Sequence, residues 1–398
     1  MLPVLLLVLL AATGADSVEA ADWSLFGPNG PAIEFHGFAS QGFIGTTDYN
    51  YLGDSKNGSF EFTEFGLNAA FNPFPRTRIM AQAFSYDVGD AGRYDAVLDY
   101  ALAEYTFNDY FGIRAGRIRR PQGIYNDIQD VDLARTFILL PQGVYDARYR
   151  DFFVSLDGVD LFGTLPLKQA GSLAYELYTG VVRPSLDGGL ALQVRNSLPI
   201  TGRLDEIRSP TIFGGQLWWS TPIDGLRLGA SGGFVPGFDY TFTVEGPAGP
   251  IRLDEKSDVV ILQYSAEYLW KAWTFQNEYE FQNSDSDTPG VPDESSFSWY
   301  VSAEYRFNKW IAAGTYYTES YNESFKPGGA GTGATNYPSD ANQRDAAVAV
   351  RFDLTDWWLF KVEGHYLRGT DLLEDNASNP IRHDNPWWML DLKTTVSF

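Results

Sequence analysis

The sequence predicts an all-β protein, a transmembrane antiparallel β-barrel of about sixteen strands with short periplasmic turns and long extracellular loops. Three observations predict it: strands that alternate apolar and charged side chains, a regular alternation of short and long connections, and a last strand that runs to the final residue, Phe398. Aromatic residues make up 16% of the 398 residues, and Tyr and Trp favour the boundary between membrane and water.

The N-terminus has the pattern of a secretory signal peptide. Residues 2–12 form an unbroken apolar run, and the small residues within 18–20 fit a cleavage site. The run is too short to cross a bilayer as a helix, which disfavours an N-terminal membrane anchor. We therefore predict that residues 1–20 are removed and that residues 21–398 form a single barrel domain.

Composition excludes several classes of protein. A net charge of −22 argues against nucleic-acid binding. No later apolar run is long enough for a membrane helix, whereas barrel strands need only about ten residues of alternating character. The chain has no cysteine, and its histidines, His36, His365 and His383, lack metal-ligand spacing. We predict no metal, no cofactor and no catalytic residue, so the protein is not expected to be an enzyme.

Short and long connections alternate along the chain. Seven short turns fall at 72–77, 108–110, 167–171, 221–225, 271–272, 308–309 and 356. Eight long polar stretches rich in Gly and Pro fall at 46–59, 88–94, 120–151, 183–210, 236–257, 284–295, 319–343 and 369–386. This rhythm predicts sixteen strands with both termini on the periplasmic side. Two alternatives stay open: another hairpin within 236–257, which would give eighteen strands, and a short helix within 183–210.

The clearest candidate strands separate an apolar face from a charged face. In residues 273–283 four aromatic side chains share one parity, while Glu278 and Glu280 share the other. Because side chains alternate along a strand, we expect the apolar face to meet lipid and the charged face to line a water-filled lumen. The charged faces of three further strands, 258–269, 296–307 and 357–368, carry Glu267, Glu304, Arg306 and Lys361.

The connection after the fifth strand, residues 120–151, is the predicted constriction loop. It is too long for an ordinary connection, and its apolar run Ile138-Leu139-Leu140 would be unfavourable in water. We therefore expect it to fold inward against the barrel wall. The predicted pore-lining residues are Arg114, Arg117, Arg119, Arg120, Asp127, Asp130, Asp132, Arg135, Glu267, Glu278, Glu280, Glu304, Arg306 and Lys361.

Part of this region resembles the phosphate-selective porins of Gram-negative bacteria. The likeness rests on Gly116-Arg117, on Pro121-Gln122-Gly123 and on a Thr-Phe-Ile segment near Thr136. It implies a loop folded into the lumen and basic side chains that select anions. Two roles stay open for the four arginines within 114–120: an electrostatic rail for anionic solutes, or salt bridges to the aspartates of the same loop. The glutamates on other lumen faces argue against strong anion selectivity.

The last strand suggests where the protein resides. Residues 388–398 alternate, and the terminal Phe398 resembles the C-terminal sorting signal of bacterial outer-membrane barrels. The resemblance implies contact with outer-membrane lipid and lipopolysaccharide, recognition by the barrel-assembly machinery through Phe398, and, as in general porins, a homotrimer. The expected function is passive diffusion of small hydrophilic solutes or ions. The alternative is an outer-membrane receptor or adhesion barrel that binds a ligand through its long external loops.

Overall fold

A computed structural model describes residues 23–24, 32–89, 92–186, 188–197, 202–247, 249–288, 293–323, 341–373, 379 and 385–398. The predicted signal peptide, residues 1–20, and His383 lie outside these ranges. The barrel strands are β2 (Ala32–Thr46), β3 (Phe62–Phe71), β4 (Thr77–Val88), β5 (Ala96–Asn108), β6 (Phe111–Arg119), β7 (Ser155–Pro166), β8 (Ser172–Val181), β10 (Thr211–Ser220), β11 (Leu226–Gly246), β12 (Gly249–Trp270), β13 (Trp273–Ser286), β14 (Glu294–Arg306), β15 (Ile311–Asn322), β16 (Asn342–Asp353), β17 (Trp358–Gly369) and β18 (Trp387–Ser397).

Short elements supplement the barrel. Two are strands, β1 (Trp23–Ser24) and β9 (Arg203–Ile207), and two are helices, α2 (Arg150–Phe153) and α3 (Gly189–Ser197). Single 3-10 turns are η1 (Ser55–Asn57), η2 (Asn126–Ile128), η3 (Asp132–Ala134), η4 (Ala147–Tyr149) and η5 (Lys168–Ala170). Among the described residues, no helix has both the length and the apolar character needed to cross a membrane.

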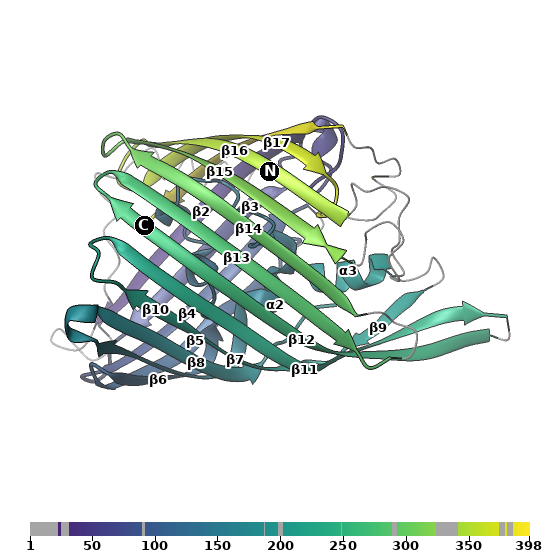
Figure 1. Ribbon diagram of the computed structural model, residues 1–398, viewed down its shortest axis with the longest axis horizontal. Helices are drawn as coiled ribbons and strands as arrows, with labels where there is room; N and C mark the ends of the chain where they lie inside the picture. The colour runs from purple at the N-terminus through teal and green to yellow at the C-terminus, as the bar shows by residue number, and fades with distance from the viewer. Residues whose placement is uncertain are drawn as a thin grey trace.

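The sixteen barrel strands close into one antiparallel sheet, which confirms the predicted fold and strand number (Figure 1). Each strand pairs with its successor, β8 pairs with β10, and β18 pairs with β2 to complete the circle. The backbone of Phe398 continues this last pairing, because its N–H and C=O bond Gly37 at 2.9 and 3.0 Å. Closure leaves no sheet edge among these strands, which a bilayer requires.

The predicted connections agree with the structure except in one place. Each of the seven predicted short turns lies between consecutive strands, and α3 is the helix considered for 183–210. The stretch 236–257 is not a loop: β11 and β12 continue through it as a paired extension, after a register shift between Val235 and Phe238. Aromatic and β-branched residues alternate in this stretch and favour strands. Figure 1 shows this hairpin projecting past the barrel, with β9 beside it.

The orientation of the two strand faces is as predicted. Tyr264 and Tyr279 are 56% and 40% exposed on the outer wall. Glu278, the neighbour of Tyr279 on the other face, is fully buried and bonds the backbone of Ile124 in the loop that follows β6. Charged side chains therefore point inward, toward a loop inside the barrel.

The loop between β6 and β7, residues 120–154, crosses the barrel interior, where Figure 1 shows α2. Its apolar run is buried as predicted, with Ile138 at 0% and Leu139 and Leu140 each at 4% exposure. Ile138 and Leu139 pack in a cluster with side chains of the wall, including Trp387. Burial of these apolar side chains is favourable and stabilises the loop inside the barrel.

Candidate functional site

The constriction loop is bound to the barrel wall at several places and exposed along one short segment. Within it, Asp127, Ile128, Val131 and Leu133 are exposed, with Val131 at 42% and Leu133 at 37%. Since these residues belong to a segment inside the barrel, they mark the face that meets the water of the lumen. The rest of the loop is bound to the wall through three groups of charged side chains.

The first anchor is the Glu278 carboxylate on β13. It accepts hydrogen bonds from the backbone N–H of Ile124 at 2.9 Å, the Tyr300 hydroxyl at 2.9 Å and the Ser265 hydroxyl at 2.5 Å, and also from the Tyr145 hydroxyl. Ile124 and Tyr145 are separated by twenty-one positions but both reach this carboxylate. One wall residue therefore ties together the beginning and the end of the loop.

The second anchor is Asp132, a loop carboxylate surrounded by cations. Its Oδ1 lies 3.1 Å from Lys361 Nζ, 3.4 Å from Lys393 Nζ and 3.4 Å from Arg135. Lys361 also donates to the backbone carbonyls of Asp132 and Phe137 at 2.9 and 3.1 Å. Both lysine side chains are fully buried, so their charges depend on these partners.

The third anchor joins the loop to β5. Asp130 pairs with Arg119 and with Arg150, the latter at 2.7 Å, and Asp99 on β5 pairs with the same two arginines. Gln82 on β4 donates to Asp99 at 2.9 Å. Two aspartates and two arginines thus alternate around one buried group, which explains how a loop so rich in charge packs inside a protein.

Smaller contacts complete the attachment. Arg351 on β16 donates to the carbonyls of Leu133 and Arg135 at 2.6 and 3.1 Å. Glu304 on β14 is hydrogen-bonded to Thr136. Gln122 donates to Glu280 at 3.0 Å.

Two of the loop aspartates, Asp130 and Asp132, have a pKa below the usual range of the carboxyl group. Burial alone would raise the pKa of Asp132, but Lys361, Lys393 and Arg135 outweigh it and hold the pKa below its usual range. Burial opposes Arg119 and Arg150 at Asp130 in the same way, and the pKa of Asp130 is also lowered. A carboxylate with a lowered pKa stabilises the folded state above the ordinary Asp pKa of about 3.9 and loses that contribution as pH falls further.

We therefore expect the Asp132 anchor to hold from neutral pH down to about pH 4 and to weaken only in stronger acid. Single-channel current recorded at pH 7, 5 and 3 should show added flicker only at pH 3. Asp132→Asn, which has no charge to lose, should flicker at every pH. Flicker that begins in the wild type between pH 7 and 5 would contradict this assignment.

Opposite the exposed face of the loop, the wall carries one arginine among three acids. Arg114 on β6 lies 2.8 Å from Glu104, 2.9 Å from Asp160 and 2.8 Å from Glu176. The exposed Asp127 of the loop lies close enough to sense the charges of Glu176 and Arg114. The side chains of Arg114 and Glu176 are 27% and 25% exposed, so this part of the wall is open to water. The narrowing therefore has four carboxyl groups around one guanidinium.

The arginines do not form the continuous rail that the resemblance implied. Arg117 shares a wall face with Val159, which is exposed on the outside, and it pairs with Asp157 at 3.3 Å. Its contacts therefore lie on the wall, and they do not join it to the loop. Arg120 is buried at 1% exposure and donates to Gln122 at 2.5 Å. It is the first residue of the loop, and its side chain is buried between the loop and the wall.

The alternative role proposed for the arginines, salt bridging, fits the structure better. Arg119 binds Asp130 of the loop as that role requires, whereas Arg114 binds acids of the wall. Of the remaining predicted residues, Glu267 pairs with Arg227 at 2.6 Å. Arg306 pairs with Asp353 at 3.0 Å beside a short turn, and Asp353 also pairs at 2.7 Å with Arg351, which bonds the loop.

Several residues of the site were not predicted from the sequence. Lys393 and Arg150 carry two of the anchors, and Glu104, Asp160 and Glu176 surround Arg114. The alternation of β18 places Lys393 on the charged face of that strand, so the sequence pattern could have identified this residue. The three wall acids sit on β5, β7 and β8, and only the barrel register shows that they converge on one arginine.

A closed sixteen-stranded barrel with a long inward loop is the fold of outer-membrane porins, and solved structures match it. No protein-family model and no curated protein sequence matches the chain. The chain is similar in structure to a loop L8 deletion mutant of OmpT, an outer membrane protein of Vibrio cholerae, at 10% identity and a TM-score of 0.58 over 93% of this chain and 100% of that one.

Two further structures show the same likeness. Salmonella typhi OmpF in complex with daunomycin matches at 13% identity and a TM-score of 0.57, over 95% of this chain and 100% of that one. The anion-selective porin from Comamonas acidovorans matches at 10% identity and a TM-score of 0.56, over 92% of this chain and 100% of that one. At such low identities these likenesses show a shared fold.

Proposed function

We propose that this protein is an outer-membrane porin, a passive channel through which small hydrophilic solutes and ions diffuse down their gradients. The observation that carries the proposal is the constriction loop. It is held inside the barrel by Glu278, Asp132 and Asp130 and exposed to water at Asp127, Ile128, Val131 and Leu133. A wall that buries so many charges against a loop, yet leaves one face of that loop wet, suits a narrowed aqueous passage. Diffusion needs no chemical step, and we propose no catalysis.

We further propose that the passage favours cations. Four carboxyl groups lie around the single guanidinium of Arg114, and side chains lining a narrowing decide which ions enter. Packing inside the barrel and the nearby Glu176 raise the pKa of Asp127 to about 7, so we expect the preference for cations to increase as the pH rises above 7. The anion preference implied by the family resemblance depends on free basic side chains. Here Arg114 and Arg119 are already bound to carboxylates, which argues for the opposite sign.

Ion selectivity in a planar bilayer tests this proposal. We expect steady open steps whose reversal potential in a KCl gradient indicates a preference for K⁺ over Cl⁻. Asp127→Asn combined with Glu176→Gln should shift the reversal potential toward the anion side. The recordings belong at or below about 0.1 M salt, where the Debye length is still about 10 Å.

The matched control is Asp285→Asn, an exposed acid near the outer end of β13, which should leave the reversal potential unchanged. A Cl⁻ preference in the wild type, or a double variant with the wild-type reversal potential, would reject the cation proposal. Steady open steps of either selectivity would still support a porin.

The second candidate function is a receptor or adhesion barrel. The observation that favours it is the projecting hairpin of β11 and β12, widened by β9, which extends past the barrel. A correctly folded protein that inserts into bilayers but shows no open steps would favour this function over a porin.

The proposed surroundings follow from the same fold. We propose that residues 1–20 are a signal peptide, that the barrel resides in the bacterial outer membrane, and that its apolar wall contacts lipid and lipopolysaccharide. Recognition by the barrel-assembly machinery through Phe398 belongs to this proposal. So does a homotrimer, which one matching OmpT structure of Vibrio cholerae, described as a trimer form, supports.

A further inference from the structure

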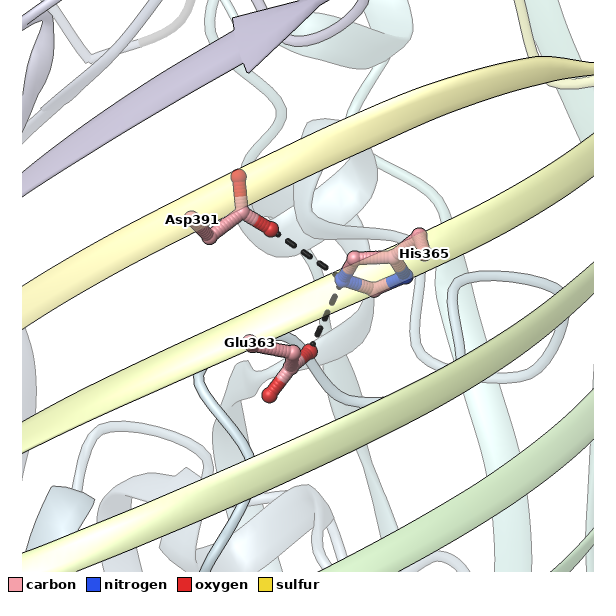
Figure 2. A group of neighbouring side chains, drawn as sticks. All are labelled: Glu363, His365 and Asp391. Carbon is pink, nitrogen blue, oxygen red and sulfur yellow. Dashed lines mark ion pairs between the residues drawn. The ribbon is translucent and has the colours of Figure 1, made fainter.

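A second group of charged side chains lies inside the wall, away from the narrowing. Glu363 and His365 stand two positions apart on β17 and therefore share its inner face. Asp391 on β18 is the register partner of Glu363. Figure 2 shows the three side chains converging. Glu363 and Asp391 are 0% exposed and His365 is 1% exposed.

The ligand-type atoms of this group face one another at short range. His365 Nε2 lies 3.0 Å from Glu363 Oε1 and 3.1 Å from Asp391 Oδ2 (Figure 2). Yet Nε2 and both carboxylate oxygens of Asp391 have no aligned hydrogen-bond partner. A single ring N–H shared between two oxygens makes two poorly aligned hydrogen bonds, so a proton on Nε2 satisfies this arrangement only in part.

The group is also short of positive charge. Three carboxylates, those of Glu363, Asp391 and Asp345, surround one imidazole. Among the described residues no Lys or Arg lies within ion-pair distance of these three acids. The lysines that flank the group in sequence, Lys361 and Lys393, pair with Asp132 and Glu64 instead. Buried carboxylates without a cation are costly.

We propose that Glu363, His365 and Asp391 bind a divalent transition-metal ion of the Zn²⁺ class. One imidazole nitrogen and two carboxylate oxygens are donors that such ions accept. Ligand atoms about 2.0–2.2 Å from one ion lie about 3.3–3.6 Å apart in a tetrahedral site, so Nε2 would move a few tenths of an ångström from each oxygen to admit the ion. Mg²⁺ and Ca²⁺ prefer oxygen ligands alone, so the histidine nitrogen disfavours both ions at this site.

The other side of the imidazole has the partner that a metal-binding histidine requires. His365 Nδ1 lies 2.9 Å from Asp345 Oδ2. A carboxylate in this position accepts the Nδ1–H and fixes the tautomer that leaves Nε2 free to bind a metal. Asp345 is thus a positioning residue outside the ligand set.

The site is coupled to the constriction loop. Glu363 Oε2 accepts the backbone N–H of Ile138 at 2.5 Å, and Oε1, which faces His365, also accepts the backbone N–H of Leu139 at 3.3 Å. The carboxylate therefore bonds the loop with both oxygens, and Oε1 would be shared between the Leu139 amide and the proposed ion. Because the loop covers the site, we expect the ion to bind while the barrel folds and to leave the folded protein slowly.

Metal content tests the proposal directly and independently of any channel activity. Full-length protein is refolded in detergent with ZnCl₂, desalted and analysed for metal, with MgCl₂ as the comparison. We expect about one Zn²⁺ retained per chain, as three converging protein ligands provide for one ion, and no retained Mg²⁺. Asp391→Asn and His365→Asn should lower Zn²⁺ affinity by at least the ~10- to 100-fold that loss of an outer partner costs.

The matched control is His36→Asn, because His36 is exposed on β2 and outside the group; its Zn²⁺ content should equal that of the wild type. Refolding with Co²⁺ adds a visible absorption spectrum as a second measurement on the wild type, in case a variant fails to fold. Folded wild type without Zn²⁺ would overturn the proposal, and so would Asp391→Asn that binds Zn²⁺ as the wild type does. Either result would leave His365 as a protonated partner of its carboxylates.

Discussion

Asp132→Ala is expected to detach the middle of the constriction loop from the barrel wall. The substitution removes the carboxylate that Lys361, Lys393 and Arg135 share, and it leaves two fully buried ammonium groups without it. Breaking a buried ion pair by removing one partner costs about 3–5 kcal/mol. We expect larger and noisier single-channel currents, together with trypsin cleavage after Arg135, which is buried in the wild type at 7% exposure.

The comparison variant is Asp132→Asn, which keeps the shape and one acceptor oxygen and should fall between alanine and the wild type. Heat-dependent migration on a denaturing gel checks that each barrel has folded. If folded Asp132→Ala shows currents as quiet as those of the wild type and trypsin does not cleave after Arg135, the other two anchors are sufficient to hold the loop.

Glu278→Ala is expected to release both ends of the loop together. Its carboxylate receives the Ile124 N–H and the hydroxyls of Tyr145, Tyr300 and Ser265. Hydrogen bonds to a charged group contribute about 1.5–3 kcal/mol each, and donors left buried without an acceptor add a cost. We expect a lower unfolding temperature and faster hydrogen exchange at the Ile124 amide.

Glu278→Gln is the matched control, since it keeps an oxygen for the Ile124 amide and should protect it in part. Glu280→Gln is a second one, because Glu280 bonds only the neighbouring Gln122 in this loop. Equal exchange rates at Ile124 in Glu278→Ala and Glu280→Gln would refute the special role of Glu278.

The sequence alone was enough to predict the barrel, because the patterns that indicate its strands and turns are local. Alternation and turn composition place strands such as β13 within a few residues, and Tyr279 and Glu278 already show which faces differ. The stretch 236–257 was misjudged because its Gly and Pro residues suggest a loop, while the alternation from Tyr240 to Val244 carries a weaker strand signal.

The site was harder to predict from the sequence because its contacts join residues that are far apart in the chain. Asp132 and Lys361 are separated by 229 positions, and no local pattern shows which lysine a loop aspartate meets. The likeness to phosphate-selective porins drew attention to the arginines but not to their partners. Arg117 was assigned to the lumen, although its parity on β6 matches the outward-facing Ala115 opposite Val159.

The loop lies off-centre, and that asymmetry divides the barrel into two sectors with different constraints. The inner faces of β13 to β18 are covered, so substitutions there should change how firmly the protein holds together. The wall around Arg114 on β6 and Glu176 on β8 remains open to water, so substitutions of these two residues should alter permeation and leave folding intact. Asp99 and Arg119 nearby, in contrast, belong to the third anchor. An engineer could therefore retune permeation from one sector while treating the other as scaffold.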